Sequence, residues 1–350
     1  MNISLKDHLK VGCYLNQRLG VCVVGAGERG TQHAHAWSKI GSVDLISVAD
    51  VNPLRARRLA KDLKFKFWST DFESAILREG VNVVSICTPA FYHPEIAIFA
   101  ASHGKHILCE KPIALTIEDA ERMIHTARTN KVKLCIGFQR RYSRYFEVLA
   151  DLISDGEIGR PVMYRLESAV EIRPKKAMHD MKRGNAGPIV DGCCHFFDLW
   201  RLIFHSEPKE VIAKGFVFAR DREELQDIEE LAPDTAAIIV EFVSGDLGVI
   251  TISWGLPPGV RGRSGSDVLG PEGVILLEKE SMTIIKEGGN VRRVGPFVED
   301  ALLNEVQDFI DCVLTGREPK ATGEDGLVAL KVSLAALESM FSGKPVKVTT

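Results

Sequence analysis

The stretch LGVCVVGAGERGTQHAHAWSKI, residues 19–40, joins an apolar strand to a helical pattern through a glycine-rich turn. Gly25, Gly27 and Gly30 form the pattern GxGxxG directly after the strand and directly before the helix. Such glycines permit a tight turn, a close approach of the backbone to a pyrophosphate, and close packing of the helix on the strand. The N–H groups at the helix N-terminus also favour an anion. This context predicts a dinucleotide site.

A second strand, DLISVAD, follows and ends in Asp50, twenty residues after Gly30. A carboxylate at this position can accept hydrogen bonds from both hydroxyls of an adenosine ribose, and it would repel a 2′-phosphate. Val51 and Asn52 come next, where an NADP site favours arginine. We therefore expect NAD rather than NADP, despite three arginines on the helix that follows.

Strand-like and helical segments alternate along the first 137 residues. This alternation predicts a Rossmann-type, doubly wound parallel sheet over residues 18–137. Residues 1–17 are interpreted as an N-terminal extension without an assigned function. Strands are expected near residues 19–24, 44–49, 65–68, 82–87, 106–109 and 132–136. Helices are expected near residues 29–40, 53–63, 71–79, 92–103 and 116–130.

Three loops of this domain place polar residues just after strands, where open parallel sheets bind ligands. These loops are CTPAFYH (87–93), CEKP (109–112) and GFQRRY (137–142). Lys111 is ordinarily a surface residue at such a position, but here its ammonium is expected to project into the cleft. A desolvated lysine can exchange protons or polarise a hydroxyl. The residues expected to contact the cofactor are Gly25, Gly27, Glu28, Arg29, Gly30, Asp50, Thr88, Pro89, His93, Glu110, Lys111 and Gln139.

Three ionisable residues interrupt the apolar run GPIVDGCCHFFDLW, residues 187–200. Asp191, His195 and Asp198 are spaced by four and three residues, which puts them on one face of a helix expected over residues 188–204. The rest of this helix is apolar, so it should be largely buried, where carboxylates and imidazoles are costly unless paired. The helix alone leaves two interpretations open, a structural Asp–His contact in a core or a site that handles protons.

Residues 138–350 change character to consecutive strand-like runs, such as RPVMYRLESAVEI and DTAAIIVEFV. Such runs predict a large, mostly antiparallel open sheet in a C-terminal α+β domain. Helices at 188–204, 300–315 and 323–341 are expected to cover one face of it. The predicted fold class is thus α/β, with a substrate-binding and oligomerisation domain after the Rossmann domain.

Two basic stretches are ambiguous. The loop IRPKKAMHDMKRGNAG, residues 172–187, makes Arg173 and His179 candidates for contact with a sugar hydroxyl, carboxylate or phosphate, although most of it is expected to be solvated. Arg140, Arg141 and Tyr142 lie at the domain boundary. They are either ligand contacts or an interdomain salt bridge beside a packed ring.

Composition favours a two-domain cytoplasmic enzyme. The chain of 350 residues is longer than one hydrophobic core usually spans. Its net charge of −3 implies no nucleic-acid partner, and no apolar stretch approaches the ~20 residues that cross a membrane. The eight cysteines show no CxxC pair and no zinc-ligand spacing, so we expect reduced thiols and no metal site.

The order and spacing of these motifs resemble those of the glucose–fructose oxidoreductase/inositol dehydrogenase (Gfo/Idh/MocA) family. The resemblance covers nearly the whole chain and includes EKP, the Asp-x-x-x-His pattern of Asp191 and His195, and the turn GPEG at 270–273. Two departures stand where the resemblance places the substrate or the nicotinamide. GNAGP replaces a run that commonly holds three glycines, and Ala90 stands where asparagine is commoner.

The resemblance implies an NAD-dependent oxidoreductase that transfers a hydride between the nicotinamide and a secondary alcohol or ketone carbon of a sugar, inositol or related polyol. His195 is expected to be the general base, Lys111 the cation on the reacting oxygen, and Asp191 the group that binds a neighbouring hydroxyl. Lys111 and His195 are able to exchange roles. The expected substrate contacts are Lys111, Arg173, His179, Asp191, His195 and Asp198.

The resemblance also implies a homodimer or homotetramer that associates through the open face of the second sheet. Two alternatives remain, an NAD-dependent glycosidase that oxidises its substrate transiently and a non-catalytic sugar- or nucleotide-sensing regulator. The presence of both Lys111 and His195 favours dehydrogenation. Inositols, aldoses, sugar acids, nucleotide sugars and glycosides all remain open as substrates.

Overall fold

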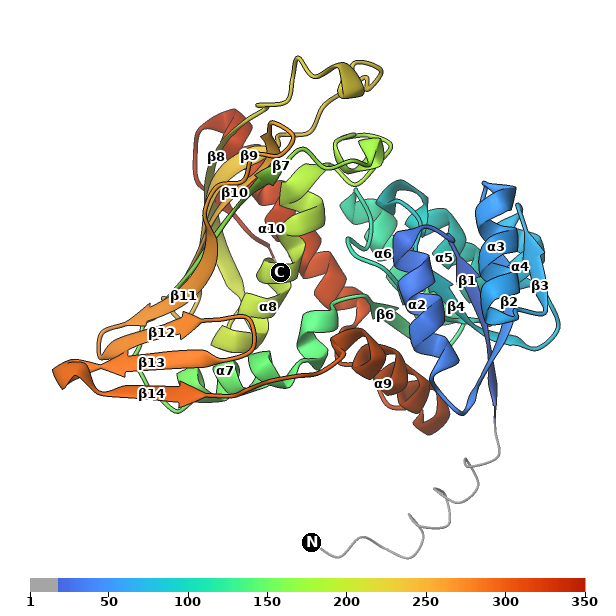
Figure 1. The fold of residues 1–350 in the computed structure, drawn as a ribbon, viewed down its shortest axis with the longest axis horizontal. Coiled ribbons are helices and arrows are strands. Elements are labelled where there is room, and N and C mark those ends of the chain that lie inside the picture. Colours follow the sequence, from blue (N-terminus) through green and yellow to red (C-terminus); the bar gives the residue numbers. More distant parts are fainter. Residues whose placement is uncertain (1–17, 350) are drawn as a thin grey trace, which may run out of the picture.

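The structure, a computed structural model, describes residues 18–349, which form two α/β units (Figure 1). The first unit contains a six-stranded sheet in the order β3-β2-β1-β4-β5-β6, with all neighbours parallel. This confirms the predicted doubly wound parallel sheet. Its strands are β1 (Leu19–Val24), β2 (Val43–Ala49), β3 (Phe67–Ser69), β4 (Val81–Ile86), β5 (His106–Cys109) and β6 (Leu134–Ile136). Its helices are α2 (Glu28–Ser38), α3 (Pro53–Leu63), α4 (Phe72–Ile76), α5 (His93–Ser102) and α6 (Ile117–Thr129).

Local sequence explains how these elements begin and end. All six residues of β1 are buried, because helices cover both faces of a parallel sheet. Asn52 caps α3 by accepting hydrogen bonds from two N–H groups of its first turn, and Pro53 follows where its missing N–H costs nothing. Helix α4 ends at Ile76, earlier than predicted, and Gly80, with φ of +87°, then turns the chain into β4.

The second unit contains a nine-stranded sheet in the order β14-β13-β12-β11-β7-β10-β9-β8-β15. Its neighbours are antiparallel except for β7 and β10, so the predicted mostly antiparallel sheet is confirmed. The strands are β7 (Met163–Glu171), β8 (Pro208–Phe216), β9 (Thr235–Phe242), β10 (Leu247–Leu256), β11 (Ser264–Gly270), β12 (Gly273–Leu277), β13 (Met282–Lys286), β14 (Val291–Val294) and β15 (Val346–Lys347). The helices are α7 (Arg144–Ser154), α8 (Cys194–Phe204), α9 (Ala301–Thr315) and α10 (Gly323–Ser342).

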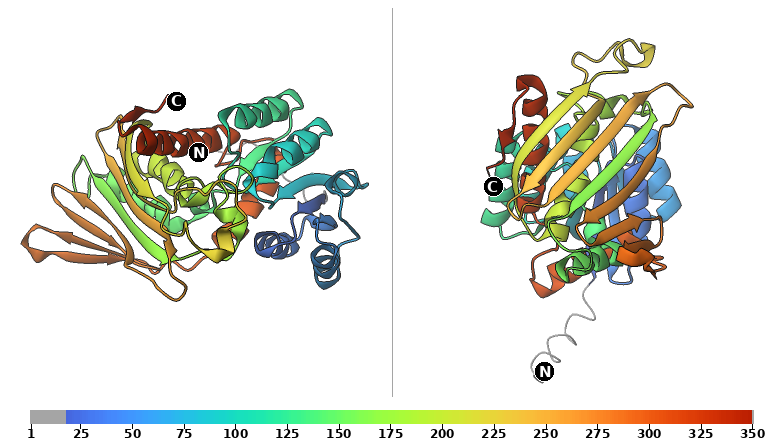
Figure 2. Two further views of the ribbon diagram at one scale, coloured as in Figure 1. Left: turned by 90° about the horizontal axis from the view of Figure 1, so that it is seen from above. Right: turned by 90° about the vertical axis from the view of Figure 1, so that its left-hand side faces the viewer.

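Helices α7, α8 and α10 lie on one side of the large sheet, and its other face is left open (Figures 1 and 2). A sheet covered on one face only requires buried and exposed side chains to alternate along each strand, and β9 shows this alternation. Ile238 and Val240 are fully buried under the helices, whereas Ile239 points outward. No helix within residues 18–349 is long and apolar enough to span a membrane. All seven cysteines in that range are free thiols.

The helix predicted over residues 188–204 is divided. Pro188–Gly192 forms a π-helical turn, in which the Cys193 N–H donates to Pro188 O, and α8 begins only at Cys194. Gly192 explains part of this geometry, because a Cβ there would lie 3.0 Å from the Trp254 ring. The wider turn changes the angular position of Asp191 relative to the residues of α8. The prediction of one continuous helical face is therefore wrong, and such π-turns are frequent at functional sites.

The C-terminal part of the chain returns to the first unit. Helix α9 packs against α2, and Figure 1 shows it beside the Rossmann sheet. The Ile136 N–H donates to Ala321 O, and Cys135 forms a β-bridge with Thr322 at the free edge of β6. The two units are thus joined at several points along the sequence.

Helix α9 also buries a carboxylate between the units. Glu305 is fully buried, and neither of its carboxylate oxygens has a partner within the described residues. Burial, together with the charge of Glu110, raises its pKa to about 8. A group with a pKa raised by folding binds its proton more tightly in the folded state. Its contribution therefore lowers stability as pH rises from about 4.5 toward 8.

We expect Glu305→Gln to weaken this pH dependence, because an amide cannot ionise. The free energy of unfolding should fall by about 3 kcal/mol less in the variant than in the parent between pH 5.5 and 8, slightly below the limit of ~1.4 kcal/mol per pH unit for one proton. Urea denaturation at several pH values measures this. Glu338→Gln, at an exposed position of α10, is the matched control. Parallel stability curves for Glu305→Gln and the parent would contradict the assignment.

Candidate active site

The glycine-rich turn leaves room for a phosphate. Gly25 has φ of +96°, and a Cβ at Gly30 would lie 1.7 Å from Gly25 O, so both positions require glycine. A Cβ at Gly27 would meet nothing within 4 Å. Gly27 is the N-cap of α2, and no side chain caps this helix. The N–H groups of its first turn thus face open space and fit the pyrophosphate of a dinucleotide.

Asp50, directly after β2, forms hydrogen bonds with this turn. Its Oδ2 accepts a hydrogen bond of 2.7 Å from Ala26 N–H, and its Oδ1 accepts one of 2.8 Å from Asn52 N–H. The carboxylate therefore has a fixed orientation beside the turn. That position fits a ribose of the same dinucleotide.

Glu110 is the centre of a buried charge cluster beneath the turn. Its Oε1 lies 2.6 Å from Arg29 Nε and 2.8 Å from His33 Nε2. Burial opposes protonation of His33, but the sulfur of Cys87 and the Glu110 carboxylate raise its pKa to about 10. Arg29 also donates to Gln139 Oε1 at 3.2 Å. Three expected cofactor contacts, Arg29, Glu110 and Gln139, are thus bonded to one another.

The loop after β4 contains one residue that is available to a ligand and one that is not. The Thr88 hydroxyl is buried and has no partner among the described residues, so it is free to bind a cofactor. His93 is 1% exposed, and its ring nitrogens lie 2.9 Å from the carbonyl oxygens of Thr88 and Pro112. His93 therefore joins the loops after β4 and β5. Its surroundings give it a structural role rather than a surface toward the cleft.

Lys111 and Asp191 form an ion pair between the two units. Lys111 Nζ donates to Asp191 Oδ1 at 2.5 Å and to the Asp191 carbonyl at 2.9 Å. Both side chains are largely buried. Burial opposes the charge on Lys111, but Asp191 outweighs it and raises the lysine pKa. The ammonium thus keeps its proton, and the pair holds the loop after β5 against the π-turn.

His195 lies in the first turn of α8, four residues after Asp191. Its Nδ1 is buried without a partner among residues 18–349, and the Phe138 ring stands edge-on at 6.1 Å. Burial lowers its pKa well below the usual value, and the positive charges of Lys111 and Arg140 lower it further. At neutral pH the ring is therefore a neutral imidazole that is able to accept a proton.

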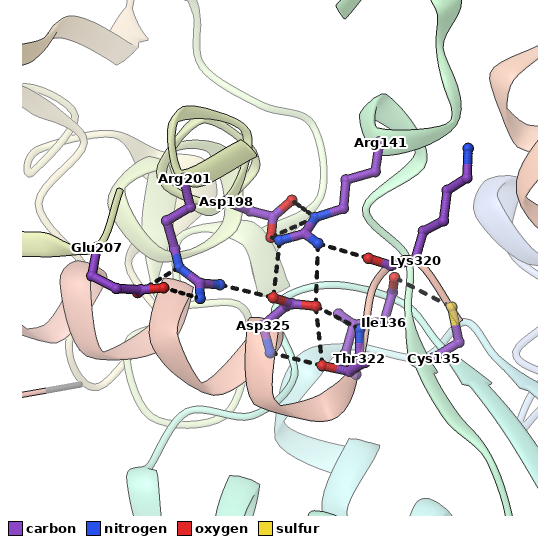
Figure 3. A network of polar contacts seen from close by, with 9 residues as sticks. All are labelled: Cys135, Ile136, Arg141, Asp198, Arg201, Glu207, Lys320, Thr322 and Asp325. Atoms are coloured by element: carbon purple, nitrogen blue, oxygen red, sulfur yellow. Dashed lines mark hydrogen bonds and ion pairs between the residues drawn. The ribbon is translucent and has the colours of Figure 1, made fainter. Parts of the chain in front are cut away.

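Asp198 belongs to a different cluster (Figure 3). Its carboxylate is 1% exposed and accepts hydrogen bonds from Arg141 Nη2 at 2.7 Å and Nε at 2.9 Å. Arg141 also pairs with Asp325 at 3.0 Å, and Arg201 binds Asp325 at 2.8 Å. The structure thus brings Lys111, Asp191 and His195 together but directs Asp198 to Arg141. Arg141 forms a salt bridge, but with Asp198 and Asp325 of its own domain rather than between domains, and Tyr142 is a buried ring.

The loop of residues 172–187 lies against the loop after β4, where the Phe91 N–H donates to Gly184 O. His179 is buried, with Nε2 3.0 Å from Arg173 O, so it stabilises its own loop. The exposed Arg173 side chain lies 5.3 Å from the Trp254 ring centre. Asn185 Oδ1 accepts a hydrogen bond of 2.9 Å from Ala90 N–H. The two departures from the family pattern therefore contact each other.

This loop also contacts the glycine-rich turn through Lys175, which pairs with Glu28 at 2.9 Å. Glu28 was expected to contact the cofactor; its carboxylate is exposed and bonded to Lys175, and the cofactor contact stays a prediction. Two surface hollows, of about 240 and 390 Å³, lie around Asn82 at the opposite, amino-terminal edge of the sheet. They are remote from Lys111 and are not the candidate site.

Several residues of these clusters were missed by the sequence analysis, notably His33, Glu305 and Asp325. His33 follows Arg29 by four residues on α2, and this spacing is a signal that they share a face. The pattern Thr322-x-x-Asp325 is the signature of a capping box, which the structure contains. That signature indicates the cap but not the ion pairs of Asp325. Nothing in the local sequence of Glu305 signals its burial.

Comparison with known proteins agrees with this geometry. Residues 19–138 match the model of the oxidoreductase family with an NAD-binding Rossmann fold, and residues 150–348 match the C-terminal alpha/beta domain of the same family. The chain is 32% identical to myo-inositol 2-dehydrogenase of Thermotoga maritima, over 94% of this chain and 98% of the relative. It is 28% identical to scyllo-inositol 2-dehydrogenase (NAD(+)) of Bacillus subtilis, over 95% and 97% of the two chains.

Solved structures share the fold. Myo-inositol 2-dehydrogenase from Lactobacillus plantarum superposes with a TM-score of 0.78 at 24% identity, covering 95% of this chain and all of that one. A levoglucosan dehydrogenase in complex with NADH and levoglucosan gives a TM-score of 0.84 at 22% identity, with the same coverage. The fold and the sequence define an NAD-binding oxidoreductase with two domains. The chain belongs to the Gfo/Idh/MocA oxidoreductase family.

We expect Arg141→Met to destabilise the protein, because it leaves the Asp198 carboxylate buried without its partner. The loss should be about 3–5 kcal/mol at pH 7.5. Burial already raises the Asp198 pKa to about 6 in the presence of Arg141, so Asp198 should take up a proton in the variant. The loss should therefore shrink at pH 5. Chemical denaturation at both pH values measures it, with the exposed Arg144→Met as control. An equal loss at both pH values would contradict this account.

Proposed function

We propose that the protein catalyses reversible, NAD-dependent oxidation of a secondary alcohol carbon in a sugar, inositol or related polyol. The observation that carries this proposal is the Lys111–Asp191 ion pair beside His195, at the carboxyl edge of the dinucleotide-binding sheet. The bound nicotinamide would supply the hydride acceptor. The similarity of this chain to two inositol 2-dehydrogenases supports the substrate class. The open glycine turn and the unpartnered Thr88 hydroxyl support the fit of NAD.

His195 is the proposed general base. Its lowered pKa leaves it neutral and ready to take the hydroxyl proton of the substrate. Lys111 is the proposed cation, because its raised pKa keeps it charged where negative charge develops on the same oxygen. These opposite shifts argue against an exchange of the two roles. Asp191 orients Lys111, and its remaining oxygen is available to a neighbouring hydroxyl of the substrate.

The choice of NAD over NADP rests on Asp50. Hydrogen bonds from Ala26 and Asn52 fix its carboxylate beside the turn. A 2′-phosphate placed there would meet this negative charge without a countercharge from Val51 or Asn52. This supports NAD as the preferred cofactor.

We expect Lys111→Met and His195→Ala each to lower kcat by about 10²- to 10⁴-fold, as is typical for loss of a positioned acid–base group. Binding of NADH, followed by its fluorescence, should change little. Turnover is measured as NADH absorbance with a panel of polyols and sugars and NAD. Lys61→Met, at an exposed position of α3, is the matched control.

Three outcomes would contradict the proposal. If the turnover of a variant stayed within a few-fold of that of the parent, the role assigned to the substituted residue would be wrong. Cleavage of a glycoside without net NADH would favour the transient-oxidation alternative. Tight NADH binding with no turnover of any panel member would favour the sensor.

The open face of the large sheet supports a homodimer or homotetramer. Ile212 on β8 and Ile239 on β9 are directly opposite each other in the register and are 46% and 42% exposed. Phe216 is also exposed on β8. A cluster of exposed apolar side chains on a sheet face is typical of an association surface.

We expect light scattering at micromolar concentration to find at least twice the 38.6 kDa of one chain. The pair of substitutions Ile212→Glu and Ile239→Lys should reduce the mass toward that of one chain, because association would bury both charges. Phe341→Lys, at a more exposed apolar position on α10, is the control. A parent protein of 38.6 kDa would contradict the proposed assembly.

A further inference from the structure

The loop of residues 172–187 connects the second unit to two loops at the carboxyl edge of the Rossmann sheet. Strands β1 and β4 are neighbours in the order β3-β2-β1-β4-β5-β6, and the strand order reverses between them. In open parallel sheets a dinucleotide binds outside the carboxyl ends of the strands, at this point of reversal. The glycine-rich turn follows β1 on one side of that point, and the loop of residues 87–93 follows β4 on the other.

On the β1 side, the contact is an ion pair at the start of α2. Lys175 Nζ lies 2.9 Å from Glu28 Oε2, and Glu28 is the first residue of α2, directly after Gly27. The free N–H groups of this helical turn fit a pyrophosphate, which a lone carboxylate beside them would repel. Lys175 neutralises that carboxylate. It also lowers the pKa of Glu28, so both partners are charged at neutral pH.

On the β4 side, the contacts are hydrogen bonds to the backbone of the loop after β4. Ala90 N–H donates to Asn185 Oδ1 at 2.9 Å, and Phe91 N–H donates to Gly184 O at 3.2 Å. The 172–187 loop is therefore attached on both sides of the point where the strand order reverses. A dinucleotide bound there would lie between the two attachments.

The 172–187 loop keeps its shape through contacts of the second unit. Asn185 N–H donates to Ala177 O at 2.7 Å, and a Cβ at Gly184 would lie 1.9 Å from the same oxygen. Ala232 N–H donates to His179 O at 2.9 Å, which joins the loop to the segment before β9. The loop thus belongs to the second unit as a preformed piece. Its contacts with the glycine-rich turn and with the loop after β4 are able to break without unfolding it.

We propose that the 172–187 loop closes over a dinucleotide bound at the Rossmann sheet, and that the Lys175–Glu28 ion pair slows the release of this dinucleotide. This inference rests on the proposed function, whose cofactor occupies that place. The two side chains are 55% and 67% exposed. An exposed pair contributes little free energy and is screened by salt. Such a pair suits a contact that has to form and break in every catalytic cycle.

Stopped-flow fluorescence of NADH tests this proposal. Mixing the protein with NADH measures the association rate, and displacement of bound NADH by excess NAD measures the dissociation rate. The variants are Lys175→Met, Glu28→Gln and the double substitution. Lys176→Met is the matched control, because Lys176 is equally exposed at 55% but pairs with Asp227, at 2.6 Å, within the second unit.

We expect Lys175→Met and Glu28→Gln each to raise the dissociation rate about two- to fivefold, the scale of an exposed ion pair. The association rate should stay within about twofold, because the contact closes after the dinucleotide has entered. The double variant should release NADH no faster than the single variants, since each substitution already removes the same contact. In about 1 M salt the difference between Lys175→Met and the parent should shrink. Lys176→Met should match the parent.

Three results would overturn the inference. They are unchanged or slower release in Lys175→Met or Glu28→Gln, slower association in Lys175→Met, and an equal effect of Lys175→Met in the parent and in Glu28→Gln. The second result would mean that Lys175 attracts the dinucleotide instead of retaining it. The third would mean that Lys175 binds the cofactor directly.

The same measurements separate this inference from the proposed function. Unchanged release in both single variants, together with NADH formation from a polyol, would overturn the inference and leave the proposed function standing. Faster release in both variants, without NADH formation from any polyol or sugar, would support the inference and contradict the proposed function. A parent protein that does not bind NADH would contradict both.

Discussion

The ion pair between Lys111 and Asp191 is the contact on which the rest of the site depends. It joins the carboxyl edge of the nucleotide-binding sheet to the π-turn that precedes α8, and so links the two units beside His195. It also determines protonation. The buried carboxylate keeps the ammonium charged, and that positive charge helps to keep the nearby His195 neutral. In the proposed mechanism this contact provides both the fixed cation and the neutral base that oxidation of an alcohol would use.

Two buried clusters support this pair from opposite sides. On the nucleotide side, Glu110 binds Arg29 and His33 of α2 and so fixes the loop that carries Lys111. On the other side, Arg141 joins Asp198 of α8 to the capped first turn of α10 (Figure 3). Buried charges of this kind contribute little net stability, but each partner is costly to leave unpaired. The clusters therefore act mainly by restricting the arrangement of the elements around the cleft.

The sequence was sufficient for the features that depend on local periodicity. The parallel sheet, the glycine turn and the mostly antiparallel second sheet all follow from short-range patterns and their order, whereas a shared site for Lys111 and Asp191 was implied only by the family resemblance. The sequence was insufficient where contacts with distant segments determine the local geometry. Gly192 of the π-turn packs against Trp254 of a distant strand, and the π-turn breaks the single helical face expected for Asp191, His195 and Asp198. The surroundings of His93, His179 and Asp198 likewise come from loops and helices whose placement no local pattern encodes.

The return of the chain to the free edge of β6 has a consequence for how this architecture is inherited. Ala321 and Thr322 bond to that edge, and α9 packs against α2. The nucleotide-binding domain is therefore completed by a segment that lies almost two hundred residues further along the chain than β6. A gene fragment that ends at the first domain boundary would expose those apolar surfaces. Recombination that exchanged only the leading half between relatives would have to preserve this distant complement as well, which favours descent of both halves as one unit.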